Sequence, residues 1–281
     1  MKPLMKILIC LVVVVICASL MLYLFRGNYD LPVLSFGRGA DKGYTVGDES
    51  GTTAVKGEIK GLDIDWSSGS ISVHGGDVDQ VTLIESAQEK ASSRLRYKLD
   101  GGILKICERS TTVSLFSSFS KDLEIVLPLA LAQSLTSVEV DCASADIRLT
   151  ELTADKVDID TASGDITATG DYRSFEIETA SGEAELNCSI LYLEFDSASG
   201  DLTLNSAVAP EKMDVSTASG SSYISIPADA QFTLNYDTAS GEQTIDGFAG
   251  SLHKEQFICG DGSGDYSFDT ASGDVSFSVY K

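Results

Sequence analysis

The sequence has few of the residues that build most catalytic and metal sites. Its 281 residues include 2 histidines, 1 tryptophan and 6 cysteines. No two cysteines have the C-x-x-C spacing, and neither His74 nor His253 adjoins a repeated motif. These absences argue against a zinc centre and against a histidine-activated nucleophile. We therefore predict that the chain has no catalytic residues, binds no cofactor and is not an enzyme.

Positive charge is also scarce. The chain has 20 Lys and Arg against 42 Asp and Glu, which gives a net charge of -22. From Asp141 to the end there are 6 basic and 26 acidic residues, so the second half carries most of the excess. A surface of this sign repels phosphate, which excludes nucleic acid as a partner.

The spacing of the six cysteines does not indicate a disulfide framework. Cys10 and Cys17 lie in an apolar run near the start, and the other four are widely scattered: Cys107, Cys142, Cys188 and Cys259. The spacing leaves two readings open, a disulfide or buried free thiols.

One long apolar run does occur, from Ile7 to Phe25, behind Lys2 and Lys6. At 1.5 Å per residue such a helix spans a hydrocarbon core of ~30 Å. A cleaved signal peptide is the alternative. We favour an anchor in residues 1–26, which keeps the amino end in the cytoplasm of a single-pass cell-membrane protein and places the rest outside. Residues 27–57 are predicted to be a flexible spacer.

Helical periodicity is absent beyond this run, and alternation of apolar and polar residues takes its place. It marks strands within 62–73, 81–86, 95–107 and 122–128, with a hairpin turn at Asp100-Gly101-Gly102 and a loop at 114–120. Trp66, on one of these strands, is expected in the core or at an edge rather than on a sugar. We predict one β-repeat domain over 58–281, with a degenerate part at 58–140 and regular repeats at 141–281.

The regular part repeats a six-residue motif: DTASGD at 160–165, ETASGE at 178–183, DSASGD at 196–201, DTASGE at 237–242 and DTASGD at 269–274. Its glycines are Gly164, Gly182, Gly200, Gly220, Gly241 and Gly273, and Ala145 takes the same place in an earlier copy. Most repeats are therefore about 18–21 residues long, and a longer last interval holds an insertion. Stacked repeats of this size predict an all-β, parallel β-solenoid with Val157 and Ile159 facing inward. The competing fold makes TASG the loop of an antiparallel hairpin.

The motif itself has a structural explanation. Glycine suits a corner that needs positive φ, and the Thr and Ser hydroxyls are expected to bond the corner backbone. The acids before and after the corner form two ladders, and both lose their charge at Ser216 and Ser221. A catalytic carboxylate pair would occur once, so repetition favours solvated positions. Weak Ca²⁺ binding is the rival hypothesis, with Asp160, Asp165, Asp196 and Asp201 as candidate ligands.

The segment LPLALAQSLTSVEVDCASADIRL, followed by TASGD corners and preceded by the apolar run, resembles the bacterial "putative adhesin" family of β-strand repeat proteins, in particular members of the Lia cell-envelope stress system of Gram-positive bacteria. The resemblance covers residues 58–281. It implies an extracytoplasmic β-solenoid without catalytic residues. Our leading hypothesis is that this domain presents a binding surface to another envelope protein or polymer, as a scaffold in the stress response. The alternative function is a β-helix enzyme that acts on cell-wall polysaccharide.

Overall fold

The computed structural model describes residues 43–86, 94–108, 120–253 and 256–280, with the side chain of His253 excepted. The predicted anchor, most of the spacer, Cys10, Cys17 and most of the loop expected at 114–120 lie outside these ranges. No helix among the described residues has the length and apolar character needed to cross a membrane.

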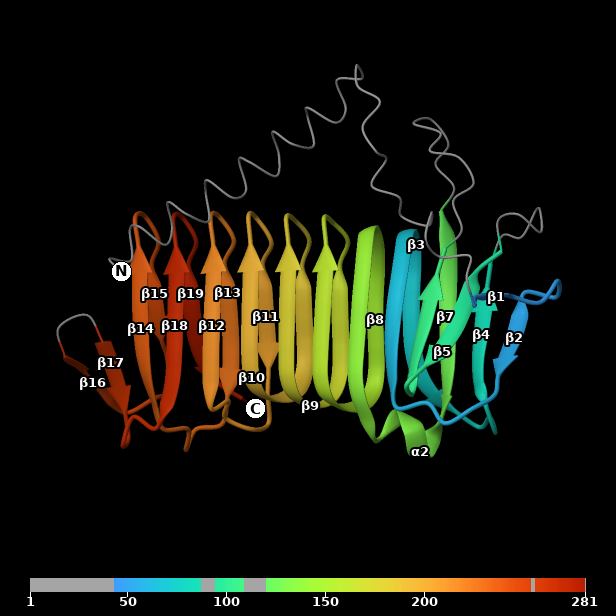
Figure 1. The fold of residues 1–281 in the computed structure, drawn as a ribbon. Coiled ribbons are helices and arrows are strands. Elements are labelled where there is room, and N and C mark those ends of the chain that lie inside the picture. The colour runs from blue at the N-terminus through green and yellow to red at the C-terminus, as the bar shows by residue number, and fades with distance from the viewer. Residues whose placement is uncertain (1–42, 87–93, 109–119, 254–255, 281) are drawn as a thin grey trace, which may run out of the picture.

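The described chain is an elongated stack of coils whose strands form one continuous sheet, and this sheet bends so that each coil contributes one rung to each of two layers that face one another (Figure 1). The longest strands supply rungs to both layers: β3 (Gly61–Gly76), β8 (Leu135–Thr161), β9 (Ile166–Thr179) and β10 (Ala184–Ser197). β3 and β8 run through a corner of the motif type as strand, whereas β9 and β10 lie between two motif corners and bend at the opposite edge of the stack. Later rungs are separate strands: β11 (Leu202–Asn205), β12 (Lys212–Thr217), β13 (Ser222–Ile226), β14 (Phe232–Thr238), β15 (Gln243–Ile245), β18 (Gly264–Thr270) and β19 (Val275–Val279).

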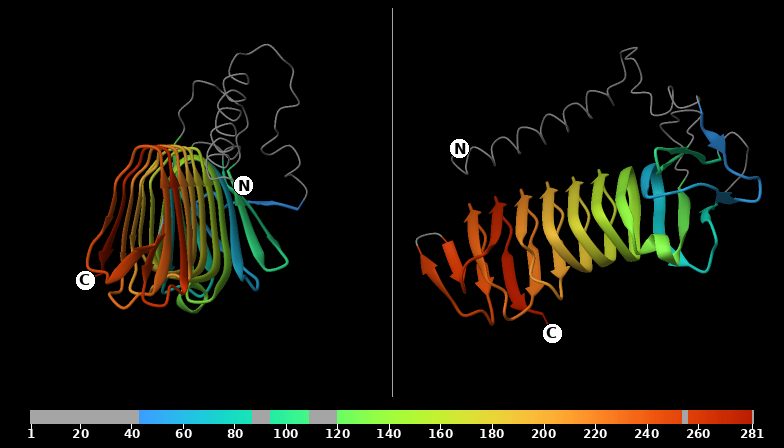
Figure 2. Two further views of the ribbon diagram at one scale, coloured as in Figure 1. Left: turned by 90° about the vertical axis from the view of Figure 1, so that its left-hand side faces the viewer. Right: turned by 60° about the horizontal axis from the view of Figure 1, so that its bottom comes forward.

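We call the rungs before each corner the first sheet and those after it the second sheet. In the first sheet, β10 pairs in parallel with β12, and in the second it pairs in parallel with β11. Figure 2 shows the strands of successive coils lying one behind another. The predicted all-β, largely parallel stack is therefore confirmed, and the antiparallel TASG hairpin is wrong.

The core lies between the two sheets and follows the predicted parity. Val157 and Ile159 are fully buried in the first sheet, while Ile166 and Ala168 are buried in the second. Aromatic rings fill much of the core at the end of the stack that holds β14 and β18. There Phe232 stacks on Tyr266, with 4.9 Å between the ring centroids. Each coil has one apolar edge on each side, which only the neighbouring coils can cover.

Strands with antiparallel pairings finish the amino-terminal end of the stack: β1 (Thr45–Val46), β2 (Thr52–Val55), β4 (Val81–Glu85), β5 (Arg96–Asp100), β6 (Ile103–Cys107) and β7 (Lys121–Pro128), with the short helix α2 (Leu129–Ala132) after β7. β6 and β7 also pair in parallel with β3, which joins this end to the stack. β5 and β6 form the predicted hairpin, and Gly101 and Gly102 have φ of 60° and 90° in its turn. Val55 is buried in the core, so part of the segment expected as a spacer belongs to the fold.

The carboxyl-terminal coil does not lie at the end of the stack. β18 pairs with β12 on one side and with β14 on the other, and β19 lies in the same way between β13 and β15. The coil of β14 and β15 therefore lies at the end of the stack, and the carboxyl-terminal coil of β18 and β19 lies between it and the coil of β12 and β13 (Figure 1). The insertion seen in the sequence forms β16 (Gly250–His253) and β17 (Gln256–Cys259), a hairpin whose β17 pairs antiparallel with β14.

Candidate functional site

The corner hydroxyls bond the corner backbone, as predicted from the motif. Thr161 Oγ1 donates to the carbonyl oxygen of Ser163 at 2.8 Å. In a later coil the hydroxyl accepts instead, because the amide of Gly220 donates to Thr217 Oγ1 at 2.8 Å. These bonds tie the hydroxyls to the backbone of their own corner, which is a structural role.

The corner glycines are required for two different reasons. Gly164 and Gly182 have φ of 122° and 128°, as predicted. The prediction of positive φ is wrong for the other four corner glycines, which do not lie in that region: Gly200, Gly220, Gly241 and Gly273. At all six corners an added Cβ would lie within 1.8 to 2.5 Å of a carbonyl oxygen of the adjacent coil, so a side chain there would force the backbone to shift. Ala145 lies within β8, which continues through its corner as strand.

The acids after the corner hold neighbouring coils together. Asp146 Oδ1 accepts the amide of Asp165 at 3.1 Å, and Asp165 Oδ1 accepts the amide of Glu183 at 3.0 Å. Ser221 continues the pattern without a charge, since its Oγ accepts the amide of Asp274 at 3.3 Å. This ladder of side chain to backbone hydrogen bonds explains why serine can replace the acid there.

The outer face of the first sheet carries two adjacent columns of carboxylates. The first acidic column consists of Asp63, Glu139, Asp158, Glu176, Glu194 and Asp214, and the second of Asp65, Asp141, Asp160, Glu178, Asp196, Asp269 and Asp237. We call both together the acidic face. The inserted coil places Asp269 before Asp237, the reverse of their order in the chain.

Lysines contact the first column of the acidic face. Lys105 pairs with Asp63, and Lys156 Nζ lies 2.6 Å from Asp158 Oδ2 and 3.2 Å from Glu176 Oε2. Like charges 4.8 Å apart repel by about 0.9 kcal/mol even in bulk water. These three pairs relieve part of that repulsion in the first column.

In the second column, the repulsion between carboxylates contributes to raised pKa values. Burial, together with the charges of neighbouring carboxylates, raises the pKa of each of five members: Asp65, Asp141, Asp160, Glu178 and Asp196. The largest shift is at Asp196, whose pKa rises to about 6 through burial and then through Glu194 and Glu178. A surface that holds carboxylates in this state favours an incoming positive charge.

The residues considered for Ca²⁺ do not converge. Asp160 and Asp196 belong to the acidic face, whereas Asp165 and Asp201 accept backbone amides in the corner ladder. The carboxylate after the glycine is not among the charges that raise the pKa of Asp160 or Asp196. The part of the chain that the structure describes has no group of three or more His, Cys, Asp or Glu side chains suited to a metal ion.

A buried ion cluster lies at the amino-terminal end of the stack. Lys121 Nζ contacts Glu85 Oε1 at 3.0 Å and Glu108 Oε1 at 3.7 Å. The indole of Trp66 donates to the carbonyl oxygen of Lys121 at 3.0 Å, so the ring lies in the core as predicted. Our sequence reasoning missed this cluster, although Glu85 and Lys121 both occupy inward positions of their strands.

The four described cysteines are free: Cys107, Cys142, Cys188 and Cys259. Cys188 and Cys259 are buried, which matches the free-thiol reading. His74 does have a partner that the sequence did not reveal, because its Nε2 lies 3.0 Å from Glu124 Oε1.

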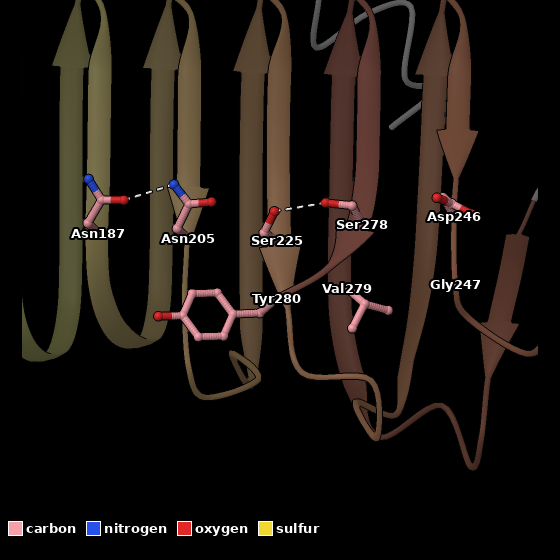
Figure 3. Close-up of a pocket in the computed structure, with 8 residues that line it drawn as sticks. All are labelled: Asn187, Asn205, Ser225, Asp246, Gly247, Ser278, Val279 and Tyr280. Atoms are coloured by element: carbon pink, nitrogen blue, oxygen red, sulfur yellow. Dashed lines mark hydrogen bonds between the residues drawn. The ribbon is translucent and has the colours of Figure 1, made fainter.

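A polar groove with a volume of about 590 Å³ crosses the outer face of the second sheet (Figure 3). One row of five coils lines it with Asn187, Asn205, Ser225, Ser278 and Asp246, and Gly247, Val279 and Tyr280 complete the lining. Asn205 Nδ2 donates to Asn187 Oδ1 at 2.8 Å, and the hydroxyls of Ser225 and Ser278 lie 2.8 Å apart. The sequence offered no sign of this groove beyond the outward parity of its residues.

Solved structures of similar shape come from bacteria. A "putative adhesin" from Bacteroides fragilis has 14% identity and a TM-score of 0.47, with 84% of this chain and 98% of that chain covered. A "putative adhesin" from Parabacteroides distasonis has 13% identity and a TM-score of 0.46, with 85% and 98% covered. A "putative lipid binding protein" from Parabacteroides distasonis has 13% identity and a TM-score of 0.42, with 84% and 97% covered.

No curated protein matches the sequence. The model of one protein family does match it, over residues 59–278, and that family is described as Toastrack DUF4097. The match includes nearly all of the two-sheet stack, and it begins two residues before β3 and ends within β19. The chain therefore belongs to the Toastrack DUF4097 family.

Proposed function

We propose that the chain is a non-enzymatic, membrane-anchored protein of the bacterial cell envelope, whose repeat domain lies outside the cytoplasm and serves as a binding scaffold in the stress response. The apolar run from Ile7 to Phe25 supports the anchor. The scarcity of histidine, and the use of the motif hydroxyls in hydrogen bonds to the corner backbone, support a role without catalysis. The observation that carries the proposal is the acidic face, where the register of the parallel strands aligns carboxylates on successive coils. Burial, and then the charges of neighbouring carboxylates, raise the pKa of Asp160, Glu178 and Asp196 there.

Such a face fits a partner with regularly spaced positive charges. Binding of a cation brings the attraction of several carboxylates and removes part of their mutual repulsion. The parallel stack keeps the rungs about 4.8 Å apart, so the charges are already in place before the partner arrives. The proposed partner is therefore a Lys-rich or Arg-rich segment of another envelope protein.

The partner can be tested with a photo-crosslinking residue placed at Glu194 in cells under envelope stress. Glu194 is exposed on the acidic face, and Glu185 is a matched control because it is exposed on the second sheet of the same strand. We expect a crosslinked protein from position 194 that weakens when Asp160, Glu178 and Asp196 are changed to amides. Equal crosslinking from both positions, or none from 194, would contradict the proposal.

The location has a test of its own. The full chain should remain with membranes after a carbonate wash, and protease added to wall-free cells should digest the repeat domain. Recovery of a shortened soluble form in the medium would instead show a cleaved signal peptide.

A further inference from the structure

We infer that the polar groove on the second sheet binds a linear, uncharged oligosaccharide of pyranose units. The inference deepens the proposed function, on which it rests for access to an envelope glycan. It uses a different face of the molecule from the acidic face.

The shape of the groove comes from the register of the stack. Asn187, Asn205, Ser225 and Ser278 occupy one row because each pairs with the next across parallel strands. The amide of Asp246 donates to the carbonyl oxygen of Phe277 at 2.9 Å, which places Asp246 at the end of the same row. The row therefore repeats at the spacing of parallel strands, about 4.8 Å, and runs along the axis of the stack.

The chemistry of the row selects a neutral ligand with both donors and acceptors. Carboxamides and hydroxyls offer both kinds of group, as sugar hydroxyls do. Asp246 adds a strong acceptor and repels phosphate or carboxylate ligands. The volume of about 590 Å³ is within the range of sites that hold small ligands.

Hydrogen-bonding capacity remains at the centre of the row. Asn205 bonds to Asn187, and Ser225 bonds to Ser278, but no hydrogen bond joins Asn205 to Ser225 among the described residues. The carboxamide oxygen of Asn205 has no protein partner within the described ranges, and one hydroxyl of the serine pair still has a proton to donate. A sugar hydroxyl between these two coils could accept from one side and donate to the other.

An aromatic ring completes the site. Tyr280 is 41% exposed, and its amide is held by the carbonyl oxygen of Ile226 at 2.8 Å. Figure 3 shows its ring beneath Asn205, at the edge of the row. Tyr223 is 50% exposed two residues before Ser225 and so on the same face of its strand. Tyrosine combines an apolar ring with a polar end, which suits the alternating surfaces of a pyranose.

The test is calorimetric titration of the full chain in a non-ionic detergent without a sugar headgroup. The probes are chitotetraose, cellotetraose and fully deacetylated chitotetraose, which is cationic. We expect an uncharged tetraose to bind with little dependence on salt. Tighter binding of chitotetraose would assign the groove to acetamido-bearing wall glycan, and tighter binding of cellotetraose to a glycan without that group.

The variants locate the site. Tyr280→Ala and Asn205→Ala should each weaken binding about tenfold, and Tyr280→Phe should keep most of it because the ring remains. Tyr192→Ala is the matched control, since Tyr192 is 36% exposed on the other sheet, with its hydroxyl bonded to Glu211. That variant should bind as the unmodified chain does.

Three results would overturn the inference: no binding of either uncharged tetraose at millimolar concentration, equal loss in Tyr192→Ala, or lower stability of Asn205→Ala with unchanged affinity. Binding of the cationic tetraose alone, abolished by salt, would also overturn it and would leave the proposal for the acidic face intact. Failure of crosslinking at Glu194, together with retained binding of an uncharged tetraose, would overturn the proposal for the acidic face and leave the glycan inference intact.

Discussion

Thr179 Oγ1 donates a hydrogen bond of 2.9 Å to the carbonyl oxygen of Ser181, whereas in the next coil the amide of Gly200 donates one of 2.6 Å to Ser197 Oγ. The Ser-Gly peptide therefore presents its oxygen to the hydroxyl in one corner and its N–H in the next. Positive φ accompanies the first arrangement, as at Gly182, and not the second. One sequence motif thus adopts two corner conformations.

The two conformations predict different costs for an added methyl group. Gly182→Ala meets both positive φ and the carbonyl oxygen of Gly164. Gly200→Ala meets the carbonyl oxygen of Gly182 and the hydroxyl of Ser197, but its φ is not positive. We expect each to lower the free energy of unfolding by on the order of 1–3 kcal/mol, with Gly182→Ala the more severe. Urea unfolding of the full chain measures this.

Gly101→Ala is the control for the backbone contribution alone, because Gly101 has φ of 60° and an added Cβ would meet nothing within 4 Å. It should cost about 1 kcal/mol. An unchanged stability of Gly200→Ala would show that the close approach between coils can relax.

The acidic face predicts an unusual dependence of stability on pH. A carboxyl whose pKa is raised on folding binds its proton more tightly in the folded state, so it destabilises the fold above that pKa. For Asp196, with a pKa of about 6, the penalty is complete above pH 7 and disappears as the pH falls toward the unfolded value near 4. Glu194, Glu178 and Asp214 add to the penalty, and a hydrogen bond from Ser216 reduces it.

Asp196→Asn should therefore stabilise the chain at pH 7.5, by about 1 kcal/mol after allowance for solvent screening, and should flatten its melting temperature between pH 5 and 7.5. Asp171→Asn, at an exposed position outside the acidic face, is the comparison. The same gain from Asp171→Asn would mean that net charge alone is responsible.

Glu151 is the one described residue other than glycine with positive φ, at 53°. Its amide donates to Thr169 Oγ1 at 2.9 Å and its carbonyl accepts from Gln133 Nε2 at 2.8 Å, so neighbours hold the backbone there. Glu151→Gly should raise the free energy of unfolding by about 1 kcal/mol, and Glu151→Ala should not. Equal effects of the two variants, seen by thermal unfolding, would contradict a backbone origin.

The buried ion cluster predicts a strong loss on removal of its cation. The side chain of Lys121 is 6% exposed and that of Glu85 is 2% exposed. Lys121→Met leaves a carboxylate buried and should cost about 3–5 kcal/mol. The double variant Lys121→Met with Glu85→Leu should recover part of this, as measured by urea unfolding. A double variant no more stable than the single one would show that Glu85 is not the group left without its charge partner.

The inserted coil predicts an unusual response to truncation. Removal of residues 264–281 takes away the strand that joins β14 to β12, so β14 and the hairpin of β16 and β17 should separate from the stack. Hydrogen exchange of the amides in Phe232–Thr238 should then become fast, while that in β10 stays slow. Continued protection of β14 would mean that it can pair directly with β12.

Much of the fold follows from local pattern. Alternation in VDIDTASGDITA predicts which side chains enter the core, because successive residues of a strand point to opposite faces. Recurrence of the motif predicts parallel stacking, since each coil has apolar edges that only another coil can bury. The hairpin at Asp100-Gly101-Gly102 also follows from local chemistry, because two glycines allow positive φ at both turn positions.

Other features depend on which coils become neighbours, and this only the tertiary structure decides. The place of the last coil between β12 and β14 cannot be predicted from the repeat, because nearly identical motifs could pair in either order. The two conformations of the Ser-Gly corner and the convergence of Glu85 with Lys121 arise in the same way, from contacts between distant segments. The groove of Asn205 and Tyr280 is the clearest case: its residues come from five coils, and only the register of those coils makes them one surface.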